Sequence, residues 1–269
     1  MPRFFVPSEQ IVRIEDGSAV TINVTVRGED AHHISHSLRM AVGDEVIICP
    51  QDGPDAGLLE YRCRINHFCT DAVTAQAAQN DVYPCCTEPP YFARLFVALS
   101  KADKMETVVQ KAVECGAGEI IPFVSSRCIA RPAEGEPKKQ QRRGRIAAEA
   151  AKQCGRGIIP RVAMPISFSA MLKEAARADL SLFFYEGEGT LPLPRLLNCL
   201  LPPRPEIALV IGAEGGFSPD EVEEARAAGL NLAGLGPRIL RCETAPIYAL
   251  SALSYAYELT DARSGNAEN

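Results

Sequence analysis

The feature that most constrains the fold is the continuous apolar run IALVIG in the strand expected at residues 206–212, which passes directly into the glycine-rich segment GAEGGFSPDE. Strands that are apolar on both faces are typical of a parallel sheet covered by helices. Ser218, Pro219 and Glu221 then form a capping box with proline at the first helical position, which predicts the start of a helix. A buried strand that turns on glycines into a capped helix indicates an α/β fold, in which ligands bind beyond the carboxyl ends of the strands.

The same alternation of strand and helix extends over most of the chain. Strands are expected at 91–100, 119–125, 180–186, 206–212 and 230–236, and helices at 104–116, 138–154 and about 245–259.

The first 75 residues have a different pattern, in which apolar and polar residues alternate as in strands covered on one face. Strands are expected at 19–26, 45–50 and 59–68, with a short helical segment within 32–44, and together they predict a small β-barrel. The proline-rich segment 81–90 is the best candidate for a linker. We therefore expect one domain at 1–80 and a second, α/β domain at 81–269, which is consistent with a chain of 269 residues and 46% hydrophobic content.

The composition also argues against several classes of protein. No apolar stretch is long enough for a membrane-spanning helix and the start lacks the apolar core of a signal peptide, so a cytoplasmic protein without a membrane partner is expected. The ten cysteines form no CxxC pair, which argues against a zinc site. The adjacent Cys85 and Cys86 are the only pair whose oxidation to a disulfide is worth testing. His32 and His36 have helical spacing but no clear third ligand, so no metal is expected.

A second glycine-rich turn follows the strand expected at 230–236. Its sequence, GLGPRILRCETAPIYAL, places Arg238, Arg241 and Glu243 just before an apolar helix. Two such turns could enclose one pocket for a nucleotide-like ligand, because glycines let the backbone approach it. The alternative is that both turns have only a structural role. The first would be a tight turn, and the charged side chains of the second would cap the following helix or be solvated.

These two turns, GAEGGFSPDE and LGPRILRCETA, resemble the RsmE family of ribosomal RNA methyltransferases, which belongs to the SPOUT class. Four further segments are similar to that family in the same order: RFF (3–5), HHISHSLRM (32–40), KADKMETVVQKAVECGAGEIIPF (101–123) and EAAKQCGRGIIPRV (149–162). Two positions depart from its usual pattern, since Ala213 replaces a proline and Cys242 replaces what is more often threonine.

The resemblance implies a SPOUT-type parallel sheet with a C-terminal trefoil knot, preceded by a PUA-like β-barrel that helps to hold RNA. It implies S-adenosylmethionine as cofactor, N3 of a uridine in 16S rRNA of the small ribosomal subunit as the methylated atom, and a homodimer. Arg241 is expected to place positive charge near a carbonyl oxygen of the base, and Glu243 or Glu214 to orient the site or accept the proton. The residues expected at the cofactor are Tyr185, Glu186, Gly187, Ile211, Gly212, Glu214, Gly215, Gly216, Leu235, Gly236, Ile239, Leu240 and Arg241.

Positive charge is concentrated in one segment although the chain has a net charge of −6. Residues 127–161 contain ten basic and three acidic residues, a clustering that favours contact with a polyanion over a merely solvated helix face. The residues expected to contact RNA are Arg3, Arg39, Arg127, Arg131, Lys138, Lys139, Arg142, Arg143 and Arg156.

Two alternatives remain at this point. One is a SPOUT-class enzyme that methylates a ribose 2′-hydroxyl, which the barrel domain and the RFF opening disfavour. The other is a noncatalytic RNA-binding factor in ribosome assembly, which the intact glycines and the pair Arg241 and Glu243 disfavour.

Overall fold

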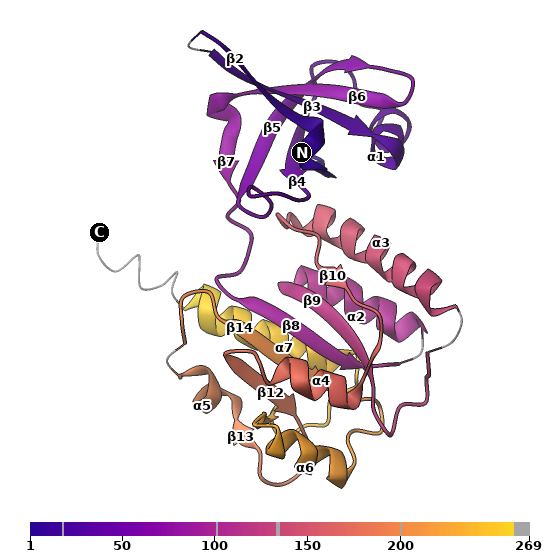
Figure 1. Cartoon of the computed structure of the whole chain (residues 1–269), viewed down its shortest axis with the longest axis vertical. Helices are drawn as coiled ribbons and strands as arrows, with labels where there is room; N and C mark the ends of the chain where they lie inside the picture. Colours follow the sequence, from indigo (N-terminus) through magenta and orange to yellow (C-terminus); the bar gives the residue numbers. More distant parts are fainter. Residues whose placement is uncertain (18, 101, 133–134, 200, 261–269) are drawn as a thin grey trace. The chain divides into compact units, whose positions relative to one another are not determined.

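The computed structural model describes residues 1–17, 19–100, 102–132, 135–199 and 201–260, and Figure 1 shows the course of the chain. This part of the chain forms two compact units. Unit 1 consists of residues 1–88 and 151–159, and unit 2 consists of residues 89–150 and those from 160 onward. Within the described ranges, no helix is both long and apolar enough to cross a membrane.

Unit 1 is built on a mixed sheet with the strand order β1-β4-β5-β6-β3-β2, to which β7 adds by pairing with β5. β1 runs parallel to β4, and the other neighbouring strands are antiparallel. The strands are β1 (Arg3–Val6), β2 (Ile11–Asp16), β3 (Ala19–Arg27), β4 (Glu45–Pro50), β5 (Leu59–Phe68), β6 (Ala72–Ala78) and β7 (Val82–Pro84).

The strands expected at 19–26, 45–50 and 59–68 are confirmed as β3, β4 and β5. β5 shows why alternation predicted them, since Tyr61, Cys63 and Ile65 are buried while Arg62 and Arg64 are exposed. The helical segment expected within 32–44 begins earlier, as α1 (Gly28–His32), and continues as the π-helical segment His33–Ser37. β2 was not predicted because it lies at the end of the strand order and is exposed along most of its length.

Unit 2 is built on a parallel sheet with the strand order β10-β9-β8-β14-β12-β15-β13, and β11 pairs with β9. Its strands are β8 (Phe92–Ala98), β9 (Ala117–Val124), β10 (Arg161–Val162), β11 (Ile166–Ser167), β12 (Leu180–Phe184), β13 (Leu191–Pro192), β14 (Glu206–Ile211) and β15 (Asn231–Gly234). The long strands are buried on both faces, as the continuous apolar runs predicted. The prediction of an α/β fold is confirmed.

Helices cover both faces of this sheet, as Figure 1 shows. α2 and α7 pack against each other, and α7 also packs on β8 and β14, while α4 packs on β8, β9 and β14 from the other side. The helices are α2 (Ala102–Glu114), α3 (Glu136–Cys154), α4 (Phe168–Ala175), α5 (Leu193–Leu197), α6 (Pro219–Ala227) and α7 (Thr244–Ser254), which continues as the turn Tyr255–Leu259.

A mostly buried arginine joins four elements of unit 2. The Arg94 guanidinium on β8 lies 2.9 Å from Glu119 on β9, 2.7 Å from Glu174 on α4 and 3.2 Å from Glu206 on β14. Only 15% of the Arg94 side chain is exposed. A charge at such depth is tolerated because carboxylates surround it, and loss of those partners would leave it unpaired.

The start of α6 has the capping box that the sequence predicted. The Ser218 hydroxyl accepts a hydrogen bond from the Glu221 N–H at 3.2 Å, and the Glu221 carboxylate accepts one from the Ser218 N–H at 2.9 Å. The other carboxylate oxygen of Glu221 accepts the Ser126 N–H at 2.7 Å. Glu221 is buried, so its carboxylate satisfies donors in two loops that precede different elements.

These contacts predict how two substitutions change the free energy of unfolding. Ser218→Ala removes one cap acceptor and should cost about 1 kcal/mol. Glu221→Ala should cost more, about 2–3 kcal/mol, because the N–H groups of Ser218 and Ser126 both lose their acceptor. Urea denaturation measures both values, and Glu224→Ala on the exposed face of the same helix is the control. Equal stability of the Glu221→Ala and Glu224→Ala variants would contradict this account.

Candidate functional site

Three loops meet at the carboxyl edge of the sheet in unit 2. They follow β12 (residues 185–190), β14 (residues 212–218) and β15 (residues 235–243), and residues from all three line one cavity of about 400 Å³. Their proximity follows from strand order, because β12 pairs with β14 on one side and with β15 on the other. The two glycine-rich turns therefore face one cavity although β14 and β15 are not neighbours, and the loop after β12 lies between them.

The structure brings most of the expected cofactor residues to this cavity. Those that line it are Tyr185, Glu186, Ile211, Gly212, Glu214, Gly216, Leu235, Gly236, Ile239, Leu240 and Arg241, together with Glu243. Gly187 and Gly215 do not line it. A Cβ at Gly187 would collide with the Tyr185 ring, and the Gly215 carbonyl accepts a hydrogen bond from Arg127 at 2.8 Å.

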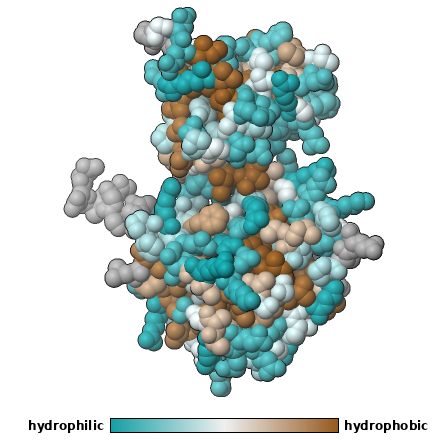
Figure 2. Space-filling view, viewed as in Figure 1, coloured by the Kyte–Doolittle hydropathy of each residue, from teal (hydrophilic) through white to brown (hydrophobic). Residues whose placement is uncertain are grey.

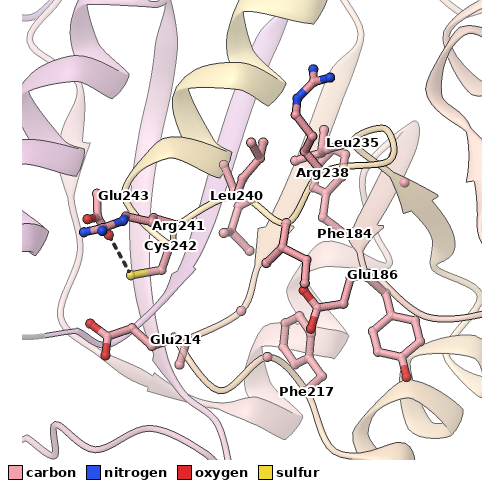
Figure 3. Close-up of a pocket in the computed structure, with 18 of the residues that line it drawn as sticks. Phe184, Glu186, Glu214, Phe217, Leu235, Arg238, Leu240, Arg241, Cys242 and Glu243 are labelled. Carbon is pink, nitrogen blue, oxygen red and sulfur yellow. Dashed lines mark hydrogen bonds between the residues drawn. The ribbon is translucent and has the colours of Figure 1, made fainter.

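One part of the cavity has an apolar floor. Phe184, Ile211 and Phe217 are all nearly inaccessible to solvent, and the Phe217 ring packs against Phe183 with 4.1 Å between centroids. A Cβ at Gly212 would lie only 2.9 Å from the Phe217 ring, so this close packing requires glycine. Figure 3 shows Phe184 and Phe217 on the same side of the cavity as Leu235 and Glu186.

The opposite end of the cavity is charged. The Lys104 ammonium, at the start of α2, contacts the Glu214 carboxylate and lies 3.6 Å from the Glu243 carboxylate. The Cys242 thiol donates a hydrogen bond to Glu243 over 3.2 Å, drawn as the dashed line in Figure 3. Two carboxylates from separate loops are thus held near one another because one ammonium offsets their repulsion.

These contacts decide which groups are ionised. Burial raises the pKa of Cys242 to about 11, and the hydrogen bond to Glu243 acts in the same direction, so the thiol is neutral at pH 7. The same hydrogen bond lowers the pKa of Glu243, and the nearby Lys104 also contributes. The hydrogen bond with Glu214 raises the pKa of Lys104. The charged end therefore carries an ammonium and an ionised Glu243.

Arg241 and Arg238 both line the cavity, at different places. In the view of Figure 3 Arg241 appears on the side of Glu243 and Cys242, whereas the Arg238 side chain appears on the side of Leu235. Arg241 is exposed, and its backbone carbonyl accepts the N–H groups of Thr244 and Ala245, each at 2.9 Å. The backbone of Arg241 thus helps to start α7 while its side chain stays at the cavity.

The residues that sequence reasoning missed at the cavity are Lys104, Phe184, Thr190, Phe217, Gly234, Cys242 and Ala245. Lys104 is the most consequential of them. It lies within the family-like segment 101–123, but only tertiary structure brings it to Glu214, which is 110 positions away along the chain.

The basic residues expected to contact RNA divide into two groups. Three of them are buried in ion pairs, with Arg3 at 2.6 Å from Glu60, Arg143 at 2.7 Å from Glu136 and Arg156 at 2.7 Å from Glu88. Moving any of these guanidinium groups to a phosphate would break an ion pair and take the arginine out of a buried position, so we assign them a structural role and remove them from the expected RNA surface. The remaining residues are exposed: Arg39, Arg127, Arg131, Lys138, Lys139 and Arg142.

Some of these exposed residues also make contacts of their own. Arg127 holds the Gly215 loop, Arg131 donates to the Ser125 carbonyl at 2.9 Å, and Arg142 lies 2.8 Å from Glu106. Among the histidines, the rings of His32 and His36 stack with 4.2 Å between centroids. Within the described residues, no group of three or more histidine, cysteine, aspartate or glutamate side chains is placed to hold a metal ion.

Known proteins resemble this chain in sequence and in fold. Residues 87–254 match the family model described as an RNA methyltransferase domain. Ribosomal RNA small subunit methyltransferase E of Bacillus subtilis (strain 168) is 35% identical over 265 residues, which cover 96% of this chain and 98% of that protein.

Two solved structures with bound S-adenosylmethionine share the fold. One, from Legionella pneumophila and described as a methyltransferase, is 30% identical with a TM-score of 0.78, covering 95% of this chain and 98% of that one. The other, ribosomal RNA small subunit methyltransferase E from Neisseria gonorrhoeae, is 26% identical with a TM-score of 0.77, covering 96% and 98%. This chain therefore belongs to the RsmE family of ribosomal RNA small subunit methyltransferases.

Proposed function

We propose that this chain is an S-adenosylmethionine-dependent methyltransferase of 16S rRNA, and that N3 of a uridine is the atom methylated. The observation that carries the proposal is similarity to a ribosomal RNA small subunit methyltransferase over 96% of the chain. That similarity spans all three loops of the cavity, and two neighbours of the same fold contain S-adenosylmethionine.

The cavity has the properties that such a cofactor requires. Its volume of about 400 Å³ lies in the range of small-molecule sites, which is roughly 300–1,000 Å³. Phe184, Ile211 and Phe217 offer apolar surface to an adenine ring, and the glycine-rich loops let backbone groups approach a ligand closely. Glu186 could accept hydrogen bonds from ribose hydroxyls. The bound cofactor supplies an electrophilic methyl group on a sulfonium.

The charged end supplies what the acceptor base requires. N3 of uracil carries a proton, and the anion left by its removal spreads onto O2 and O4. Arg241 and the Lys104 ammonium supply positive charge for those oxygens. The lowered pKa of Glu243 makes it a weak proton acceptor, so we assign Glu243 to hydrogen bonding of N3–H and orientation of the base. We propose that Glu214, the other carboxylate at this end of the cavity, receives the proton.

We also propose the trefoil knot and the PUA-like barrel. The course of the chain supports the knot. In the strand order, β12 separates β15 from β14, but α7, which follows β15 in the chain, packs on β14 and β8. The segment 235–243 must therefore cross back over the carboxyl edge, past the other two loops. The small mixed sheet of unit 1, with its short helical insertion, supports the barrel.

The RNA surface and the dimer complete the proposal. Lys138, Lys139 and Arg142 on α3, with Arg39, Arg127 and Arg131, offer exposed positive charge to phosphates. Ile239 is 82% exposed although it lines the cavity, and Ile129 is 77% exposed, which supports burial of both by a second copy of the chain. The enzyme would act in the cytoplasm, on 16S rRNA within the small subunit.

The direct test is methyl transfer from labelled S-adenosylmethionine to isolated small ribosomal subunits that lack the modification. Digestion and mass spectrometry of the nucleosides should give 3-methyluridine. The variant Arg241→Ala should lower the rate about a hundredfold, because charge stabilisation at one oxygen is worth that much in comparable sites. A product methylated on ribose, or no transfer, would contradict the proposal.

The contact between Cys242 and Glu243 predicts a change in pH dependence. A hydrogen bond to the ionised carboxylate lowers the pKa of Glu243, so its loss in Cys242→Ala should raise that pKa. If activity needs ionised Glu243, the acid limb of kcat/KM should then move to higher pH. Cys242→Ser keeps a donor and should retain the wild-type limb. Superimposable profiles for Cys242→Ala and the wild type would show that Glu243 has no such role.

A further inference from the structure

Unit 1 contains a second cavity, of about 290 Å³, that the methyl transfer described above does not use. It is lined by Ile11 and Arg13 of β2, Ile22 of β3, Leu59 and Tyr61 of β5 and Val82 of β7. β2 pairs with β3 and β7 pairs with β5, and within the described residues no ladder joins β2 to β7. The cavity thus lies at the seam where the sheet of unit 1 does not close, and we call it the seam cavity.

The floor of the seam cavity is apolar. Ile22 is 3% exposed and Tyr61 is 6% exposed, so their side chains form a fixed surface, and Ile11, Leu59 and Val82 extend it toward the mouth. Figure 2 shows that apolar side chains also gather on the surface of unit 1 on the face turned to the viewer. A floor of this kind suits one flat ring.

The mouth of the seam cavity is polar and held in place. Asp55, Gln79 and Arg13 lie at this mouth, and the Tyr61 hydroxyl donates to one Asp55 oxygen at 3.2 Å. Burial raises the pKa of Tyr61 to about 12, and the Asp55 charge adds to the effect, so the hydroxyl stays protonated and Asp55 stays the acceptor. The second Asp55 oxygen and the Gln79 amide remain for a ligand, and the Arg13 guanidinium brings positive charge beside them.

We propose that the seam cavity holds one unstacked base of the RNA substrate, an inference that rests on the proposed function. Proteins read single-stranded RNA by taking a splayed-out base against apolar or aromatic side chains and bonding its edge. The floor accommodates the ring, the Asp55 carboxylate accepts from an N–H of the base edge, and Arg13 meets the adjoining phosphate. The volume of about 290 Å³ is enough for a single ring system.

The test compares RNA with and without bases. Fluorescence anisotropy measures binding of the full chain to a single-stranded RNA of about ten nucleotides without uridine, so that the cavity of unit 2 has no substrate base, and to the same sugar-phosphate backbone with abasic sites. Wild type should bind the base-containing RNA at least about fivefold more tightly. Gln79→Trp, which fills the cavity without changing charge, should abolish that preference and leave abasic binding unchanged.

Matched arginine variants separate the cavity from general electrostatics. Arg13 and Arg64 are both exposed on strands of unit 1 and both pair with a glutamate, but Arg64 does not line the cavity. Arg13→Ala should weaken binding of the base-containing RNA about five- to tenfold and Arg64→Ala by less than about twofold. Thermal unfolding establishes that each variant is folded.

The proposal is overturned if wild type does not distinguish the two RNAs, if Gln79→Trp binds like wild type, or if both arginine variants lose affinity equally. A cavity that takes a peptide instead would give the first of these results. Methyl transfer by wild type to small subunits is measured in parallel. Absence of transfer refutes the proposed function, whereas transfer combined with any of the three results above refutes only the seam cavity as a base site.

Discussion

The placement of β12 between β14 and β15 is the constraint on which the cavity of unit 2 depends. Parallel strands that are buried on both faces can adopt few arrangements, because each must satisfy its backbone in a ladder and its side chains against helices on both sides. Here that requirement brings the ends of three strands together at one edge. The loops that follow these strands therefore lie close together, so the cavity is formed by the packing of the sheet and not by the loops alone.

The charged end of the cavity follows from the same arrangement. Glu214 comes from the loop after β14, Glu243 and Arg241 come from the loop after β15, and Lys104 comes from the helix that follows β8, the other neighbour of β14. The glutamates would repel each other without the ammonium between them. The contacts of Lys104 therefore hold the two acidic side chains close together at one end of the cavity.

Much of the fold could be predicted from sequence because local patterns decide it. Alternation indicated β3 and β5, the run IALVI indicated β14, and the sequence from Ser218 to Glu221 indicated the start of α6. Strand order could not be predicted, since it depends on long-range packing. Lys104 was missed for the same reason, and so were the buried ion pairs of Arg3 with Glu60 and of Arg156 with Glu88. Arg143 was also expected at the surface, but it is buried and pairs with Glu136 on the same helix, α3.

The central claim is that the loops after β12, β14 and β15 enclose one methyl donor. Hydrogen exchange measured by mass spectrometry, with and without S-adenosylmethionine, tests it on the full chain. The account predicts slower exchange in all three segments, residues 185–190, 212–218 and 235–243, with no change in α4 on the face of the sheet. Protection of a single loop, or of none, would contradict it.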